Sequence, residues 1–207
     1  MNLQRAYDDW APFYDKNKNL TRDLDAEAVR EELWEMECDT LLELGCGTGK
    51  NTGFFCQIAK RVIAMDFSIQ MLKIARKKVS YPSVQFILAD IRHPWPVIKN
   101  SVDLISCNLV LEHIPDLNPI FSQAFKVLKL KGKFFICELH PSRQYLGTKE
   151  VFHDGDTITS METYVHHMSD FVDAAERNGF QFIRLKEWWH EKDKDKPPRL
   201  ISLLFQK

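Results

Sequence analysis

The fold of this chain is decided at residues 40–49, where the sequence is Thr-Leu-Leu-Glu-Leu-Gly-Cys-Gly-Thr-Gly. The first half, residues 40–44, is a short and mostly apolar run, which predicts a buried strand. Gly45, Gly47 and Gly49 then predict a turn with positive φ angles, whose backbone can approach a ligand closely. A helix that begins directly after the turn would point its positive N-terminal end at the same place. The stretch therefore predicts a site for a nucleotide-like ligand.

The spacing of the glycines excludes two common nucleotide sites. The dinucleotide pattern G-x-G-x-x-G requires a glycine at position 50, where this chain has Lys50. The phosphate-binding loop G-x-x-x-x-G-K-[ST] requires four residues between its glycines, but three separate Gly45 from Gly49. In addition, Asn51 stands where a Ser or Thr should bind magnesium. The pattern that remains is Glu43-x-Gly45-x-Gly47-x-Gly49.

Composition favours one intracellular domain. The 207 residues, 44% of them hydrophobic, are enough for one full core and predict a single domain over 1–207. Lys plus Arg total 28 against 29 for Asp plus Glu, and this balance disfavours nucleic acid as a partner. The five cysteines are widely spaced and show no zinc pattern, so we expect a reducing cytoplasm and no metal centre. No leader and no apolar run of about 20 residues is present, so no membrane span is expected.

Hydrophobic periodicity predicts strands and helices in alternation along the chain. Strands are expected at 40–44, 61–65, 84–89, 102–107, 134–137, 180–188 and 199–205. Packing helices are expected at 23–37, with Trp34 on the buried side, at 117–129, and at 169–178, with Ser169 as the N-cap. The last two strands are joined by a short charged turn, so they must pair antiparallel.

Asp66 is the first candidate for a ligand contact outside the glycine turn. It ends the second predicted strand, 21 positions after Gly45, close to the spacing at which an acidic residue meets ribose hydroxyls in Rossmann-like folds. Capping of the next helix already falls to Ser68, so Asp66 is not needed for that task. Phe67 and Met71 would then flank the adenine.

These motifs together resemble class I S-adenosylmethionine-dependent methyltransferases of the type 11/25 kind. The resemblance rests on the glycine pattern, on Asp66 and Asp90 at strand ends, and on residues 108–113, Asn-Leu-Val-Leu-Glu-His. It implies an α/β fold: a Rossmann-like, seven-stranded, mostly parallel sheet with helices on both faces and a C-terminal antiparallel hairpin. It also implies S-adenosyl-L-methionine as cofactor. The cofactor contacts that it implies, some of them weighed above, are Tyr14, Glu43, Gly45, Cys46, Gly47, Gly49, Asp66, Phe67, Met71, Asp90, Ile91, Asn108 and Leu109.

The N-terminal segment, residues 1–37, is expected to form a lid and a helix. Residues 7–15 are aromatic and acidic and favour a flap that packs onto the domain. In the family, a segment of this kind lies over the cofactor. Tyr7, Trp10 and Tyr14 are then candidates to close the pocket around a sulfonium cation.

Two histidines are candidate catalytic groups on the acceptor side. His113 could accept a proton from the acceptor near neutral pH, although a packing role fits its position equally well. His140 and Arg143 follow the fifth predicted strand and could be a base and an anion clamp, or surface residues. The polar insertion 140–163 begins there, beyond the carboxyl ends of the strands, and is expected to select the substrate.

The acceptor class stays open. A small molecule is favoured, methylated on oxygen, nitrogen or carbon, because no basic face is evident. Methylation of RNA or protein is the alternative, supported by Lys and Arg clusters at 73–78 and 126–133. A third possibility is a module that binds S-adenosylmethionine without catalysis.

Overall fold

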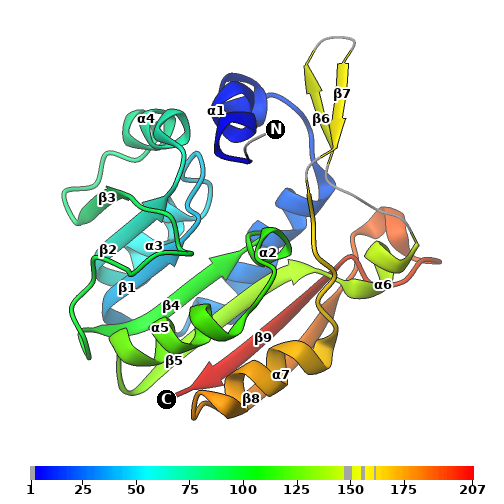
Figure 1. Ribbon diagram of the computed structural model, residues 1–207. Helices are drawn as coiled ribbons and strands as arrows, with labels where there is room; N and C mark the ends of the chain where they lie inside the picture. Colours follow the sequence, from blue (N-terminus) through cyan, green and yellow to red (C-terminus); the bar gives the residue numbers. More distant parts are fainter. Residues whose placement is uncertain (1–2, 147–150, 155–156, 161) are drawn as a thin grey trace.

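The centre of the protein is a mixed β-sheet (Figure 1). It is seen in a computed structural model that describes residues 3–146, 151–154, 157–160 and 162–207. Within these residues the strand order is β3-β2-β1-β4-β5-β9-β8. The strands are β1 (Cys38–Leu44), β2 (Ala59–Asp66), β3 (Val84–Leu88), β4 (Val102–Asn108), β5 (Leu128–Leu139), β8 (Gln181–Trp188) and β9 (Leu200–Gln206).

The strand directions confirm the predicted architecture. Strands β1 to β5 pair in parallel, and β9 lies antiparallel between β5 and β8. The chain runs from β1 outward to β3 and then returns to β4 on the other side of β1. In open α/β sheets a ligand binds at such a reversal, beyond the carboxyl ends of the strands.

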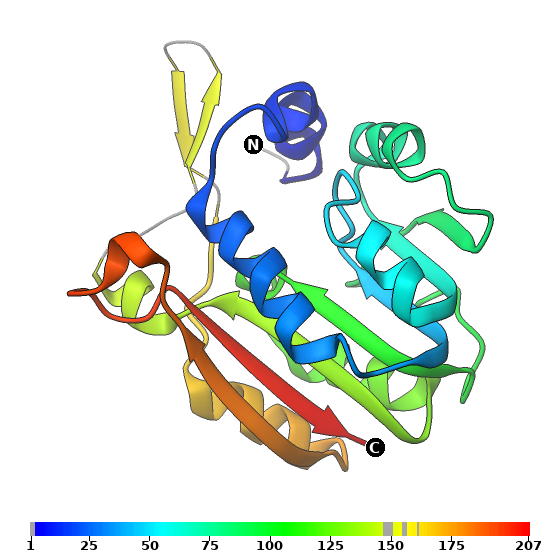
Figure 2. The same ribbon diagram turned by 180° about the vertical axis from the view of Figure 1, so that it is seen from behind.

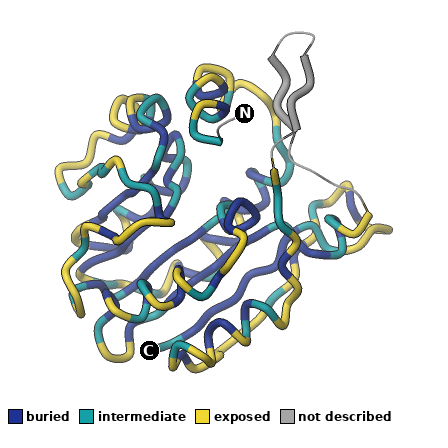
Figure 3. Tube along the Cα trace, in the orientation of Figure 1, coloured by how far each residue is buried: buried dark blue, intermediate teal, exposed yellow. Residues whose placement is uncertain are grey.

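Helices cover both faces of the sheet (Figures 1 and 2). Successive strand residues point to opposite faces, so Leu42 joins one buried cluster and Leu41 the other. The middle of the sheet is buried on both sides, as the dark tube at the centre of Figure 3 shows, whereas the edge strands β3 and β8 carry exposed residues. Helices α5 (Asn118–Val127) and α7 (Met168–Arg177) pack on the first face, and α2 (Leu20–Leu33) and α3 (Thr52–Ile58) on the second.

Two further helices lie near the carboxyl ends of the strands. Helix α4 (Ile69–Lys78) begins at Ser68, whose hydroxyl accepts a hydrogen bond from the Met71 N–H at 3.1 Å, so the predicted cap is confirmed. Helix α1 (Leu3–Tyr14) packs against α4. The predicted N-terminal flap is therefore a helix.

The helix predicted at 23–37 begins earlier and ends earlier than expected. The Asn19 side chain accepts hydrogen bonds from the N–H groups of Thr21 and Arg22, which starts α2 at Leu20. The prediction for Trp34 is wrong: the residue lies at the C-cap and is 61% exposed, where it stacks on Phe54.

Two other boundaries also differ from the prediction. Helix α7 begins at Met168, because the Asp170 carboxylate accepts a hydrogen bond from the His167 N–H at 2.8 Å; Ser169 is not its N-cap. Strand β5 begins at Leu128 rather than at Phe134. Residues 130–132, between the predicted helix and the predicted strand, form an irregularity within β5: the register shifts between Val102 and Leu104 of β4, and Lys131 has φ 64°.

The predicted insertion 140–163 contains helix α6 (Pro141–Tyr145) and a separate hairpin. Strands β6 (Val151–Asp154) and β7 (Thr157–Ser160) pair antiparallel and stand away from the main sheet (Figures 1 and 2). Residues 147–150, 155–156 and 161 of this insertion lie outside the described residues. No helix in the described part of the chain is long and apolar enough to cross a membrane.

Candidate active site

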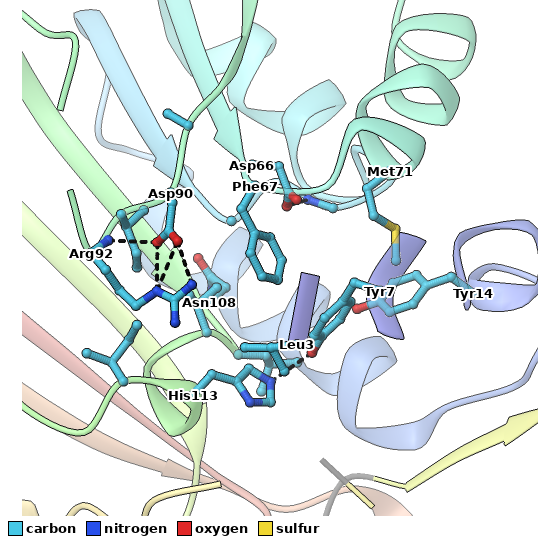
Figure 4. A pocket seen from close by; sticks show the side chains of 17 residues that line it. Leu3, Tyr7, Tyr14, Asp66, Phe67, Met71, Asp90, Arg92, Asn108 and His113 are labelled. Carbon is cyan, nitrogen blue, oxygen red and sulfur yellow. Dashed lines mark hydrogen bonds and ion pairs between the residues drawn. The ribbon is translucent and has the colours of Figure 1, made fainter. Parts of the chain in front are cut away.

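A cavity lies at the carboxyl ends of β1, β2 and β4, beneath α1 (Figure 4). It encloses about 660 Å³ of space between atoms, counting the part that opens to solvent. The predicted residues that line it are Tyr7, Tyr14, Gly45, Gly47, Asp66, Phe67, Met71, Asp90, Ile91, Asn108, Leu109 and His113.

The glycine turn has the backbone that the sequence predicted. Gly45, Gly47 and Gly49 have φ angles of 70°, 52° and 81°, which side-chain-bearing residues rarely adopt. A Cβ added to Gly45 would come within 2.3 Å of Val110 Cγ2, so this glycine permits close approach of the segment after β4. A Cβ on Gly47 would meet no atom within 4 Å. At Gly47 the wall of the cavity is therefore formed by backbone atoms that face open space.

Asp66 links the end of β2 to the glycine turn. Its carboxylate accepts hydrogen bonds from the N–H groups of Gly47 and Ser68, both at 2.8 Å. Burial raises the pKa of Asp66 to about 6, although these two backbone hydrogen bonds lower it. The carboxylate thus holds the turn in place and also lines the cavity.

Asp90 carries an ion pair at the rim of the cavity. Its carboxylate binds Arg92 in a fork, with Nε 3.0 Å from both oxygens and Nη2 2.6 Å from Oδ2 (Figure 4). Burial would raise the pKa of Asp90, but the hydrogen bonds and charge of Arg92 hold it below its ordinary value. Asp90 is therefore ionised at neutral pH.

A second cavity, of about 460 Å³ counted in the same way, continues from the first along the glycine turn. Glu43 and Cys46 line it, together with Arg22 and Asp25 of α2. The Glu43 carboxylate accepts a hydrogen bond from the Thr52 hydroxyl at 2.6 Å, and burial raises its pKa to about 8. Gly49 lines neither of these two cavities.

Arg22 is the buried cation of the second cavity. Its guanidinium lies 3.9 Å from the centre of the Tyr14 ring and donates to the carbonyls of Tyr14 and Asn17. Its Nε is buried and has no acceptor among the described residues. A donor left over in this way can bind an anionic group of a ligand.

Asp25 orients two amides beside Arg22. Its carboxylate accepts hydrogen bonds from Asn108 Nδ2 and Asn51 Nδ2, each at 2.8 Å. Asn108 Oδ1 in turn accepts from the Ser106 hydroxyl at 2.5 Å. Burial raises the pKa of Asp25 despite these hydrogen bonds. The end of β4 is thereby tied to α2 and to the start of α3.

His113 lies on the wall of the first cavity, in the 3₁₀ turn η1 (Leu111–His113) after β4. Its Nε2 lies 2.8 Å from the Tyr7 hydroxyl, and its Nδ1 lies 3.3 Å from the carbonyl oxygen of Glu162. A carbonyl only accepts, so Nδ1 carries the proton and Nε2 accepts from Tyr7. The pair joins α1 to the segment after β4 across the cavity (Figure 4).

Helix α1 is fastened over the cavity by its polar side chains. Asp8 accepts hydrogen bonds from the Ser68 hydroxyl at 2.6 Å and from the Gln70 N–H at 3.2 Å. Asp15, directly after the helix, accepts from the Thr48 hydroxyl at 2.8 Å and pairs with Lys78 at 3.0 Å. The lid therefore contacts both the glycine turn and α4.

The structure does not bring His140 into either cavity. His140 is the N-cap of α6, and its Nε2 donates to the Glu187 carboxylate at 3.0 Å. Burial lowers its pKa despite this partner. Arg143 forms an ion pair with the buried Asp193, to which Arg199 also binds. Both side chains thus join the end of β5 to the connection between β8 and β9, and neither lines either cavity.

Sequence reasoning missed three polar residues of the site. Arg22 and Asp25 precede the glycine turn; Asp25 was part of an expected packing helix, and Arg22 lay just before the predicted start of that helix. Their spacing of three places them on one face of α2, but nothing in the pattern shows that this face meets a cavity. Arg92 follows the predicted strand 84–89 by three positions, and no motif marks it. Among the described residues, no group of three His, Cys, Asp or Glu side chains could hold a metal ion, and all five cysteines are free thiols.

A sheet of this order, with a cavity bounded by a glycine turn and strand-end carboxylates, defines the class I S-adenosylmethionine-dependent methyltransferase fold. Residues 42–136 match the family described as Methyltransferase domain. The match runs from within β1 to within β5 and includes the glycine turn, so this part of the chain is similar to a methyltransferase domain. The solved structure of a methyltransferase of this type from Listeria monocytogenes has the same fold: TM-score 0.73, 22% identity, 88% of this chain and 99% of that chain covered.

Two curated relatives are methyltransferases with named acceptors. A malonyl-[acyl-carrier protein] O-methyltransferase of Hamiltonella defensa is 34% identical over 92 residues, which are 44% of this chain and 34% of that protein. A trans-aconitate 2-methyltransferase of an Enterobacter species is 32% identical over 126 residues, 60% of this chain and 48% of that protein. The chain thus spans less than half the length of each of these relatives.

Proposed function

We propose that this protein transfers the methyl group of S-adenosylmethionine to a small-molecule acceptor whose proton passes to His113. The observation that carries the proposal is the Tyr7–His113 pair, with Tyr7 Oη 2.8 Å from His113 Nε2, on the wall of the same cavity as the glycine turn. A titratable group and a nucleotide site thus face one enclosed space. The atom that is methylated, oxygen, nitrogen or carbon, depends on which acceptor binds.

The chain offers a matching group for each end of the cofactor. The glycine turn presents bare backbone, Asp66 is placed for the ribose hydroxyls, and Asp90 for the adenine amino group. A carboxylate has lone pairs for more than one donor, so their existing hydrogen bonds leave both able to accept further ones. Arg22, with its buried and unpaired Nε, is placed for the methionine carboxylate.

The cavity walls also suit a cation. When bound, S-adenosylmethionine supplies an electrophilic methyl group on a positively charged sulfur. Glu43 and Asp66 are both buried, and burial raises their pKa values to about 8 and about 6. A neighbouring positive charge stabilises the ionised forms of such groups. A bound cation would therefore favour the ionised forms of these carboxylates.

The Tyr7–His113 pair provides a route for the acceptor's proton. The Tyr7 hydroxyl donates to His113 Nε2, and a hydroxyl oxygen can accept a hydrogen bond while it donates one, so it can receive a proton donor of the acceptor. As the acceptor's nucleophile forms its bond to carbon, its proton passes to Tyr7 Oη and the Tyr7 proton passes to Nε2. The proton ends on the imidazolium, and Tyr7 is unchanged.

A small acceptor is favoured over a macromolecule for two reasons. Helix α1 is fastened across the cavity through Asp8 and Asp15, so a large acceptor would have to displace it. Two relatives are named for small acids or their carrier-bound forms, malonyl-[acyl-carrier protein] and trans-aconitate. Cytoplasmic location, predicted from cysteine usage, remains part of this proposal.

Binding is tested first, by thermal denaturation with S-adenosylmethionine, S-adenosylhomocysteine and NAD in parallel. A ligand at about 100 times its Kd adds roughly 2.7 kcal/mol to the free energy of unfolding, which raises Tm by several degrees. We expect the two sulfur compounds to raise Tm and NAD to have no effect. Stabilisation by NAD alone, or by none of the three, would contradict the cofactor assignment.

Proton transfer is tested with radiolabelled S-adenosylmethionine and a panel of small hydroxy, carboxy and amino acceptors. For the acceptor found, His113→Gln should slow methyl transfer by about 10² to 10⁴-fold, and Tyr7→Phe by up to about tenfold. Affinity for S-adenosylhomocysteine should stay unchanged in both variants. His190→Gln, at the N-cap of η2 (Glu191–Asp193), is the control and should leave the rate unaltered. An unaltered rate in His113→Gln would remove the base from the proposal.

A further inference from the structure

The turn that carries His113 is held from two sides. Turn η1 spans only three residues and ends at Ile114, so its own hydrogen bonds cannot fix it. On one side lies the end of β5, with Glu138. On the other lies the segment 162–167, here called the strap, which leads into α7.

Glu138 holds the start of the turn. Its Oε1 accepts hydrogen bonds from the N–H groups of Val110 and Leu111, both at 2.9 Å. The side chain is 3% exposed, and burial raises its pKa to about 8. Glu138, from the end of β5, thus caps the N-terminal N–H groups of η1.

The strap holds the end of the turn through His166. The Nε2 of His166 lies 2.7 Å from the carbonyl oxygen of Ile114 and 3.1 Å from that of Leu111. Both partners only accept, so Nε2 carries a proton and donates to both. The ring is 8% exposed and packs edge-on against Phe171 of α7, at 5.8 Å between ring centres. Its position is therefore set by the core.

Two more strap groups reach the turn. The Tyr164 N–H donates to the carbonyl of Glu112 at 2.7 Å. The carbonyl of Glu162 accepts from His113 Nδ1 at 3.3 Å. The strap thus engages the carbonyls of Leu111, Glu112 and Ile114 and, through the same short segment, determines which ring nitrogen of His113 carries the proton.

We propose that His166 is a positioning residue that fixes the tautomer and orientation of His113 by anchoring the strap to η1. The inference rests on the proposed function, in which His113 accepts a proton at Nε2. Without the His166 anchor, the Glu162 carbonyl is no longer held opposite Nδ1. The other tautomer, with the proton on Nε2, then becomes available, and Tyr7 would have to accept rather than donate. In a His-dependent enzyme the wrong tautomer is inactive even where the fold is intact.

The tautomer can be measured without turnover, by nitrogen NMR of protein carrying ¹⁵N-histidine. His113→Gln assigns the signal. The wild type should show His113 protonated at Nδ1. His166→Gln keeps a donor at similar reach and should keep this pattern, whereas His166→Leu removes the donor and should give a mixture of tautomers or the Nε2-protonated form. His166→Asn, whose amide is too short to reach the two carbonyls, repeats the test if His166→Leu does not fold.

Kinetics then separate the two proposals. In His166→Leu, kcat should fall by about tenfold or more, which is part of the effect of losing a general base. The affinity of this variant for S-adenosylhomocysteine should be unchanged. In His166→Gln, kcat should return towards the wild-type value. An unchanged His113 tautomer in both His166→Leu and His166→Asn would overturn the positioning role. If instead the tautomer changes but His113→Gln transfers methyl groups at the normal rate, the strap fixes His113 as inferred and the proton route in the proposed function is wrong.

Discussion

The cofactor side and the acceptor side of the cavity are built by different means. On the cofactor side, the glycine turn, Asp66 and Asp90 each follow directly from the end of a strand, and their geometry is that of the local backbone. On the acceptor side, His113 meets Tyr7 from 106 positions away and Glu162 from 49 positions away. A site of the first kind can be read from short motifs, whereas a site of the second kind exists only once the chain has folded.

The two sides of the cavity should also differ in how they respond to substitutions. The cofactor side depends on the absence of side chains and on carboxylates at fixed strand ends. The acceptor side depends on hydrogen bonds between separate segments, including α1, η1 and the strap. We therefore expect substitutions on the cofactor side to affect binding, and substitutions on the acceptor side to affect rate.

The strongest test of the cofactor side compares two glycines. Gly45→Ala should abolish detectable binding of S-adenosylhomocysteine in calorimetry and also destabilise the protein. Its φ of 70° costs about 1–2 kcal/mol with a side chain, and the new Cβ would lie 2.3 Å from Val110 Cγ2. Gly47→Ala carries similar strain without the clash, so it should retain the fold and lose mainly affinity. Equal loss of stability in the two variants would contradict the close approach at Gly45.

Asp66→Asn should weaken binding of S-adenosylhomocysteine by about 1–3 kcal/mol, the scale for losing a charged hydrogen-bond partner. Because Asp66 also accepts from the Gly47 and Ser68 N–H groups, we expect some loss of stability as well. Calorimetry and denaturant unfolding measure the two effects separately. The control is Asp39→Asn, an exposed carboxylate paired with Lys60, which should change neither. Undiminished affinity in Asp66→Asn would remove Asp66 from the ribose site.

Glu43 should make the free energy of unfolding depend on pH. Its pKa is raised from 4.5 to about 8, so above 4.5 the folded state holds a proton that the unfolded state has released. Stability should therefore fall as pH rises from about 4.5 to about 8, by up to about 1.4 kcal/mol per pH unit from this group. Denaturant unfolding at several pH values measures the slope, and Glu43→Gln should reduce it. An unchanged slope in Glu43→Gln would contradict the raised pKa.

The smallest effect is expected at His140. His140→Ala removes the cap of α6 and the contact with Glu187, so it should lower stability by about 1 kcal/mol. The rate of methyl transfer should stay within about twofold, since the loss of a positioned general base would cost about 10²-fold or more. A loss of a hundredfold would return His140 to the catalytic machinery.

Most of the sheet was predictable because each strand has its own hydrophobic run and its own boundary residue. The errors fell where a side chain from another place decided the outcome. Asn19 starts α2 before the first strongly apolar position, and the C-cap leaves Trp34 exposed. Strand β5 begins early because Leu128 already pairs with Val102 of β4, and the residues that follow form an irregularity within the strand. Local propensity is a weak determinant where tertiary pairing is available.

The predicted site divides in the same way. Asp66 and Asp90 were found because a strand end is visible in the sequence. Arg22 and Asp25 were missed because a helix face shows which residues share a side but not what that side meets. His140 was expected near the acceptor because it follows a strand, yet its side chain turns to Glu187 of β8, 47 positions away.

By itself the sequence determined the class of fold, the ligand turn and the carboxylates at the strand ends. These depend on positive φ angles, strand periodicity and short spacings, which act over a few neighbouring residues. Only the tertiary structure decided that Arg22 faces the second cavity, that Tyr7 pairs with His113, and that the strap holds η1. Such contacts depend on the directions of side chains brought together by packing, and no local rule specifies those directions.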